Sequence, residues 1–161
     1  MGNDQNRKYL TNEEIVKELV DYSYQKDAYQ HEKIEGDLLF ALIIEKARWL
    51  QFIQNDQRIM KKPDFENAYI GVAIHSTKDF HFIKDLSVNV SVYDQKGTLI
   101  GEHQHFYHPR PELHNYGQNW ILPGDGIYSI VVKIENQNDE TGKNYSVKFS
   151  NVKIQTGQHI S

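Results

Sequence analysis

The segment LSVNVSVYDQKGTLIGEHQHFYH, residues 86–108, decides the fold class of this chain. Apolar and polar residues alternate between Ser87 and Tyr93 with the period of two that a half-buried strand requires. The tetrapeptide DQKG at 94–97 has the turn residues of a hairpin, and a second strand-like stretch follows it up to His108. The segment therefore predicts two antiparallel strands joined by a tight turn.

The same strand signals recur on both sides of this segment. AYIGVAIHS at 68–76 is apolar at strand length, and GIYSIVVKIE at 126–135 alternates after a Pro-Gly-Asp-Gly turn. YSVKFSNVKI at 145–154 is the last alternating stretch. Strands spaced roughly 10–15 residues apart, with turn residues between them, are typical of a β-sandwich. We therefore expect a mainly β fold.

The N-terminal part has a different pattern. Thr11 and Glu14 form a capping box, and apolar residues follow at helical spacing, which predicts a helix over residues 12–24. The stretch LLFALIIEKARWLQFIQ, from residue 38, has two readings. It is either one buried helix to Ile53, or an apolar strand followed by an irregular excursion, and its periodicity does not separate the two.

Composition excludes several classes of protein. The chain has 161 residues, a formal charge of −4 and no cysteine. The lack of cysteine excludes disulfide scaffolds, thiolate zinc sites, blue copper sites and cysteine nucleophiles. Lys and Arg form no basic stripe, so we expect no nucleic-acid partner. The longest apolar run, LLFALII, is far shorter than a membrane span. Because neither a G-x-S-x-G nor an H-E-x-x-H motif is present, we do not expect an enzyme.

Histidines are concentrated in one stretch: four of the eight lie between residues 101 and 119. His103 and His105 form an H-x-H pair on one face of the predicted strand. His108 precedes the bend at Pro109, and His114 follows on a loop. His75 closes an earlier strand, with His81 shortly after it. Because a sandwich brings the ends of distant strands together, we expect His75, His108 and His114 to meet at one edge.

Such a cluster suits a metal ion. Neutral imidazole binds zinc, copper, iron or nickel, and Asp79, Glu102 or Glu112 would supply a carboxylate ligand or an acceptor for a second ring N–H. The alternative is that these are ordinary polar side chains of a strand and a turn. We expect His31 and His159 to lie on the surface, with His159 in a frayed tail at residues 158–161.

The stretch YGQNWILPGDGIYSIVVKIE at 116–135 resembles the periplasmic Fe2+-transport-associated protein family, small immunoglobulin-like proteins that bind copper or iron. That family has a His-Tyr-Gly-x-Asn motif followed by Leu-Pro-x-x-Gly-x-Tyr; here Tyr116–Asn119 and Leu122–Tyr128 match. The resemblance runs over about residues 37–156 and favours a strand at the start of LLFALII. AIHSTKD resembles the strand that carries one of the family's metal-site histidines, which points to His75.

The chain departs from the family at other positions of the metal site. The motif histidine falls on Asn115, one place after His114, and a ligand methionine falls on His108. An acidic residue falls on Gly71, and a further histidine falls on Lys133. Exchanging a methionine for a histidine would shift the preference from Cu(I) toward Cu(II), Zn(II), Ni(II) or Fe(II).

Together these observations define our expectations. We expect an N-terminal helical segment at 1–33 and an immunoglobulin-like β-sandwich at 34–157. The sandwich would bind a divalent metal ion, copper, iron or zinc, through His75, His108 and His114, with His103 and His105 next in line. The resemblance implies a periplasmic or cell-surface location, a membrane iron permease or another uptake component as partner, and a possible homodimer.

MGNDQNRKYL contains no signal peptide, so we expect a signal or lipid-anchor segment to have been removed. Two alternatives remain open. One is a binding or adhesion module whose histidines are incidental. The other is a redox enzyme, because H-x-H on a β-sandwich resembles Cu,Zn superoxide dismutase.

Overall fold

The computed structural model describes residues 29–108, 114–135 and 144–159, and within these ranges the chain is built of strands without a helix. The prediction of a mainly β fold is confirmed. The strands are β1 (Tyr29–Glu35), β2 (Leu38–Glu45), β3 (Leu50–Gln54), β4 (Gln57–Lys61), β5 (Ala68–Ser76), β6 (Ser87–Tyr93), β7 (Leu99–His108), β8 (Asn115–Trp120), β9 (Gly126–Glu135) and β10 (Tyr145–Ile154).

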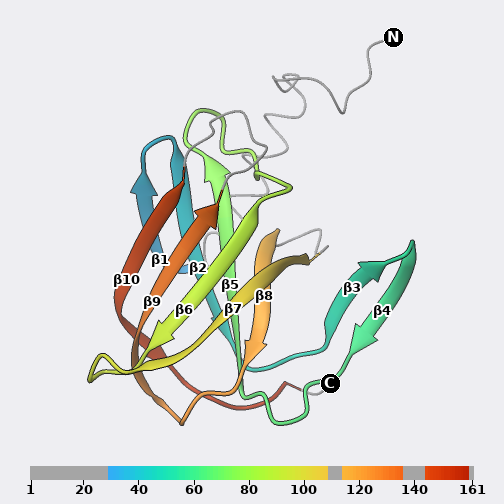
Figure 1. The fold of residues 1–161 in the computed structure, drawn as a ribbon, viewed down its shortest axis with the longest axis vertical. Helices are drawn as coiled ribbons and strands as arrows, with labels where there is room; N and C mark the ends of the chain where they lie inside the picture. Colours follow the sequence, from blue (N-terminus) through green and yellow to red (C-terminus); the bar gives the residue numbers. More distant parts are fainter. Residues whose placement is uncertain (1–28, 109–113, 136–143, 160–161) are drawn as a thin grey trace.

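Eight of these strands form one antiparallel sheet in the order β1-β2-β5-β8-β7-β6-β9-β10. β7 joins the two halves, because it pairs with β6 up to His105 and with β8 from Phe106 to His108. The sheet curves until its edge strands β1 and β10 lie side by side (Figure 1), where Lys33 Nζ donates to the carbonyl of Lys148 at 2.7 Å. The result is a nearly closed, barrel-like sheet, and the immunoglobulin-like sandwich stays a prediction.

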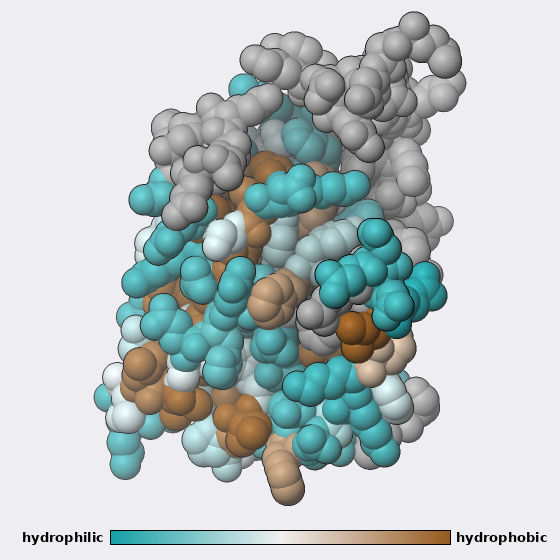
Figure 2. Space-filling view, turned by 45° about the vertical axis from the view of Figure 1, so that its right-hand side comes forward, coloured by the Kyte–Doolittle hydropathy of each residue, from teal (hydrophilic) through white to brown (hydrophobic). Residues whose placement is uncertain are grey.

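The interior of this sheet is filled by the alternating apolar residues that the sequence pattern identified. Val88, Val90 and Val92 of β6 are fully buried, as are Ile130 and Val132 of β9. Residues between them on the same strands are more exposed, such as Asn89 and Val131. β5 is buried along its whole length, as expected for a central strand covered on both faces. The face shown in Figure 2 is mostly polar, with small separate apolar patches.

The stretch from residue 38 to 53, which had two readings, is strand in both of its halves. β2 is a central strand of the barrel-like sheet, and β3 pairs only with β4 in a separate hairpin. This hairpin projects to one side of the molecule in Figure 1. Hydrogen bonds hold both of its ends. Asn119 bonds to the backbone of Arg48 before it, and Asn67 bonds to the backbone of Leu122 after it.

Two predictions concern the ends of the chain: an N-terminal helix and a frayed C-terminal tail. The predicted helix at 12–24 lies outside the described residues. β1 begins at Tyr29, within the segment 1–33 that we expected to be helical. The prediction of a frayed tail is wrong up to His159, whose N–H donates to the carbonyl of Ala47 at 2.7 Å while Gly157 bonds to Ala47 and Asn67. Among the described residues no helix is long and apolar enough to span a bilayer.

Candidate functional site

Three histidines gather at one end of the barrel-like sheet, where β5 ends and β8 begins. His75 lies on β5, His81 in the connection to β6, and His114 directly before β8. The ring of Phe82 links two of them, because its centroid is 5.7 Å from that of His75 and 5.3 Å from that of His114. We call His75, His81 and His114 the β5-end histidine group.

His75 is held as a neutral ring with a defined tautomer. Its side chain is 1% exposed, and Nδ1–H donates to the carbonyl of Phe80 at 2.8 Å, which leaves the lone pair on Nε2. Burial lowers the pKa of His75 to about 4; the Phe80 hydrogen bond opposes this shift, and the nearby His114 and His81 add to it. At neutral pH His75 is therefore the uncharged imidazole that binds metal ions.

A strained turn positions the acceptor of this hydrogen bond. Phe80 has φ of 59°, in the left-handed region that costs a residue with a side chain about 1–2 kcal/mol. Two backbone hydrogen bonds hold the turn closed, from Phe80 N–H to Ser76 O (3.0 Å) and from Ser76 N–H to His81 O (2.9 Å). The residue whose carbonyl orients His75 is therefore a strained one, and backbone strain often marks functional sites.

His81 is oriented by a carboxylate. Its Nδ1 contacts Asp79 Oδ1, which also accepts the backbone N–H of His81 at 3.2 Å. A carboxylate on one ring nitrogen is the usual support behind a histidine that ligates metal through the other nitrogen. Sequence reasoning proposed Asp79 as a carboxylate of the site but did not select His81. The two-residue spacing from Asp79 to His81 was the signal that would have identified it.

His114 is stacked against aromatic rings. Its ring lies nearly parallel to Phe82, at an interplanar angle of 27°, and to Tyr107, at 14°. Tyr107 Oη lies 3.1 Å from His114 Nδ1. Aromatic stacking and this hydrogen bond together fix the ring beside His75.

His108, expected to join His75 and His114, lies elsewhere. Its Nε2 is 2.9 Å from the carbonyl oxygen of Gly117, and its Nδ1 is 3.2 Å from that of Gln51 in the hairpin. The side chain is 3% exposed. Both nitrogens are thus directed at backbone acceptors, so a metal ion could reach either one only if the ring turned. In this arrangement His108 ties the hairpin to the barrel-like sheet.

The H-x-H pair contacts one tryptophan. The exposed His103 ring lies 4.4 Å from that of Trp120, edge to face. His105 is 1% exposed; its Nδ1–H donates to Tyr116 O (3.2 Å) and its Nε2 accepts from Trp120 Nε1–H (3.0 Å). Burial lowers the pKa of His105 to about 3. His105 therefore serves a hydrogen-bond network of the core, separate from the β5-end histidine group.

Three of the positions where this chain departs from the family surround the side chain of Tyr69. Tyr69 Oη donates to Asn115 Oδ1, and its ring lies 5.9 Å from that of His108. Two glycines leave the space that the Tyr69 and Asn115 side chains occupy. A Cβ at Gly117 would overlap the Tyr69 hydroxyl, and one at Gly71 would lie 2.6 Å from Asn115 Oδ1. A buried tyrosine network therefore fills the region that the altered residues Gly71, Asn115 and His108 surround.

Among the described residues no three His, Asp or Glu side chains are already arranged to hold a metal ion. The observations that favour a ligand role are instead the orientations of His75 and His81. Both have Nδ1 directed at an oxygen acceptor, and His114 lies beside them. This donor set fits a divalent metal ion, since it offers two imidazoles whose Nδ1 is held by an oxygen acceptor and a third imidazole nearby.

Comparison with known proteins finds no matching family model and no matching curated protein, but it does find similar solved structures. The "as isolated" FetP of uropathogenic Escherichia coli, expressed in the periplasm, has a TM-score of 0.61 at 15% identity, covering 80% of this chain and 95% of its own. Copper-reconstituted P19 protein of Campylobacter jejuni has a TM-score of 0.62 at 14% identity, covering 81% and 97%.

A copper-bound variant of Escherichia coli FetP is also similar, with a TM-score of 0.53 at 18% identity over 77% of this chain and 95% of its own. These structural neighbours match the family that the motifs at 116–135 resemble. At such low identity the likeness establishes a shared fold. Most of this chain and nearly all of each neighbour take part in it.

Proposed function

We propose that this protein is an extracytoplasmic carrier that binds one divalent metal ion, copper or iron above all, through the β5-end histidine group. In this proposal His75 and His114 are the primary ligands and His81 is the third, in place of His108. His103 and His105 are not ligands. Binding is reversible coordination without chemical turnover, and the carrier presents the ion to a membrane permease or another uptake component.

The observation that carries this proposal is the orientation of His75. A buried imidazole that is neutral at pH 7, with Nδ1–H held by a backbone carbonyl, presents Nε2 as a ligand without first releasing a proton. Asp79 supports His81 in the same way. Solved proteins that share the fold are copper-bound, which supports a metal as the bound species. One of them was expressed in the periplasm, which supports an extracytoplasmic location.

The chemistry of the site suits a cargo ion. An all-imidazole set with nearby carboxylate favours Cu(II), Zn(II) or Fe(II) over Cu(I), because it contains no thiolate or thioether. Since the three imidazoles are not already arranged around one point, we expect small side-chain movements to complete the site on binding. Such a site would release its ion more readily than a closed structural one, as a carrier requires.

Calorimetric titration tests the proposal. Protein purified without a histidine tag and treated with a chelator should bind one Cu(II) or Zn(II) per chain at pH 7. His75→Gln and His114→Ala should each weaken binding at least about tenfold, and His81→Ala less. His108→Ala and His159→Ala are the matched controls. Absence of binding by the natural sequence, or equal losses in the controls, would contradict the proposal, provided that circular dichroism shows each variant to be folded.

A second candidate function is a binding module whose histidines are incidental. It is favoured by the absence of a preformed three-ligand group within the described residues, and by apolar side chains exposed on and beside the hairpin, Ile59, Met60 and Phe65. The titration separates the two functions, because a module of this kind would bind no metal stoichiometrically.

A further inference from the structure

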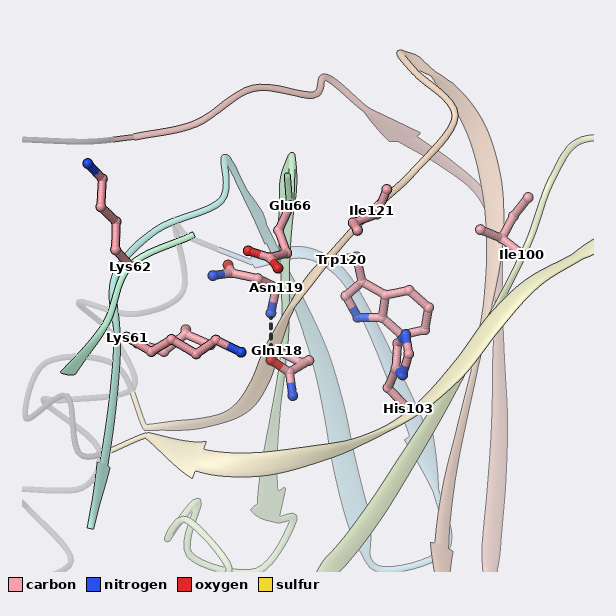
Figure 3. A pocket seen from close by; sticks show the side chains of 10 residues that line it. Lys61, Lys62, Glu66, Ile100, His103, Gln118, Asn119, Trp120 and Ile121 are labelled. Atoms are coloured by element: carbon pink, nitrogen blue, oxygen red, sulfur yellow. Dashed lines mark hydrogen bonds between the residues drawn. The ribbon is translucent and has the colours of Figure 1, made fainter. Parts of the chain in front are cut away.

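A pocket lies between the base of the hairpin and strands β7 and β8 (Figure 3), apart from the β5-end histidine group. Its volume is about 280 Å³, near the lower end of the ~300–1,000 Å³ that is usual for small-ligand pockets. Side chains from three parts of the chain line it, among them Lys61, Lys62, Glu66, His103, Gln118 and Trp120.

The walls of this pocket are fixed by hydrogen bonds at both ends of the hairpin. Before β3, Arg48 N–H donates to Asn119 Oδ1 (3.2 Å), and Asn119 Nδ2 donates to Arg48 O (2.7 Å). After β4, Asn67 N–H donates to Trp120 O (2.8 Å), and its side chain bonds twice to the backbone of Leu122. Both ends are thus held to β8 and the residue pair that follows it, so the pocket is preformed.

The polar side of the pocket carries positive charge. The ammonium group of Lys61 is directed toward Gln118, with Lys62 at the rim (Figure 3). Neither lysine forms an ion pair within the part of the chain that the structure describes. Gln118 Oε1 accepts the N–H of Asn119 at 3.1 Å, so the amide NH2 is the end that can donate to a ligand. Lys61 and Gln118 therefore form a pair of donors suited to an anion.

The opposite side of the pocket is apolar and rigid. The Trp120 indole is fixed by its hydrogen bond to His105, and the His103 ring lies edge to face against it. Ile121, which is 60% exposed, extends this side toward the opening. Trp120 is itself 1% exposed, so it forms the floor of the pocket. A flat or aliphatic group would lie against His103 and Ile121 and remove their exposed surface from water.

Glu66 limits the charge of the ligand. Its carboxylate lies on the wall beside Asn119 (Figure 3), where Oε2 accepts the N–H of Asp64 at 2.8 Å. Together with the two lysines, Lys61 and Lys62, this carboxylate leaves the pocket with one net positive charge, which a monoanion balances and a dianion such as phosphate exceeds. The pocket is thus matched to one negative charge next to an apolar body.

We propose that this pocket binds a small organic carboxylate, with the carboxylate between Lys61 and Gln118 and the apolar body against His103 and Ile121. The inference does not depend on the proposed metal site, because the two places share no residue. Benzoate is a suitable probe, since it combines one carboxylate with a flat apolar ring. Benzyl alcohol has the same ring without the charge, and inorganic phosphate has charge without the ring.

Nuclear magnetic resonance of the two tryptophan indole N–H groups tests this in the metal-free full chain, with the Trp120 signal assigned through a Trp49→Phe variant. Benzoate should shift the Trp120 signal saturably at millimolar concentrations, and both other probes should bind at least about fivefold more weakly. Lys61→Met, which keeps the length of the side chain, should weaken benzoate binding about tenfold. Lys148→Met on β10 is the matched control and should leave it unchanged.

Three results would overturn the proposal: no saturable shift with benzoate, equal binding of benzyl alcohol, or undiminished benzoate affinity in Lys61→Met. Lys61 is an exposed residue, so this variant should fold, and a dispersed amide spectrum would verify that it does. Loss of metal binding in the variants of His75 or His114 should leave the benzoate shift intact, which keeps failures of the two proposals distinguishable.

Discussion

At the scale of single residues, similar sequence contexts produced histidines with different environments. His103 and His105 are two residues apart, yet one ring is exposed and the other is buried with both nitrogens hydrogen-bonded. His75 was correctly placed at the end of a strand, but nothing in its context showed that a strained turn would supply the Phe80 carbonyl. Sequence spacing therefore identified a histidine-rich region, whereas the role of each ring depends on contacts between distant strands.

The buried histidines predict how stability changes with pH. The folded state binds protons on His75 and His105 only near pH 4 and pH 3, whereas the unfolded chain does so near 6.5. The unfolded state therefore binds more protons below pH 6.5, and stability falls as the pH drops from there toward 4. Between pH 8 and pH 5 each histidine should cost on the order of 2 kcal/mol.

Urea unfolding at pH 8 and pH 5 measures this loss. In His105→Gln the difference in unfolding free energy between the two pH values should be smaller than in the natural sequence, because one titrating group is gone. His103→Gln, at an exposed position, should leave the difference as it was. A natural sequence equally stable at both pH values would refute this explanation.

The tyrosine network predicts a second residue-scale effect. Gly117 has no room for a side chain, because a Cβ would overlap the Tyr69 hydroxyl. Gly117→Ala should therefore lower the free energy of unfolding by about 2 kcal/mol or more through displacement of Tyr69. At Gly126 a Cβ would lie 3.7 Å from the Tyr128 ring, an ordinary contact, so Gly126→Ala should change stability little. Thermal unfolding compares the two variants. Equal losses of stability would contradict the close packing of Tyr69 against Gly117.

At the scale of elements, alternation predicted the strands well where one face is buried. β6, β9 and β10 follow their apolar pattern closely. The 38–53 stretch was ambiguous because β2 is buried over most of its length, and a run of apolar residues lacks a period. The hairpin that follows was expected only as an irregular excursion. β4 is exposed throughout, so its sequence lacks the alternation of buried apolar and exposed polar residues that predicts a strand.

The hairpin depends on anchoring hydrogen bonds in addition to the packing of Leu50 against Tyr69 in a small buried cluster. A two-stranded hairpin is marginally stable alone, and Asn67 supplies three hydrogen bonds that hold its C-terminal end. Asn67→Ala removes the two side-chain bonds and should open the hairpin locally, with about 1–2 kcal/mol lost. Hydrogen exchange should then be faster in β3 and β4 but unchanged in β6. Asn89→Ala on β6 is the control; unchanged exchange in the hairpin of Asn67→Ala would contradict the anchoring role.

At the scale of the whole molecule, the observed fold agrees with the family resemblance of the sequence. The three histidines expected at one metal site, His75, His108 and His114, do not all lie together. The antiparallel pairing of the sheet brings the end of β5 beside the start of β8, which places His75 beside His114 as expected. It also sends His108 toward the hairpin, because Gln51 and Gly117 provide acceptors there. The separation of His108 from His75 and His114 depends on pairing between strands that are remote in the sequence, and sequence patterns do not reveal such pairing.

Metal binding by the β5-end histidine group is tested most directly by a long-range 1H–15N correlation spectrum of the histidine rings, recorded before and after one equivalent of Zn(II). Before addition, His75 should show the Nδ1–H tautomer. Afterwards, Nε2 of His75 and a ring nitrogen of His81 and His114 should shift, while His105 and His108 remain as they were. Shifts at His105 or His108 instead, or no shift at His75, would contradict the claim that the β5-end histidine group binds the metal.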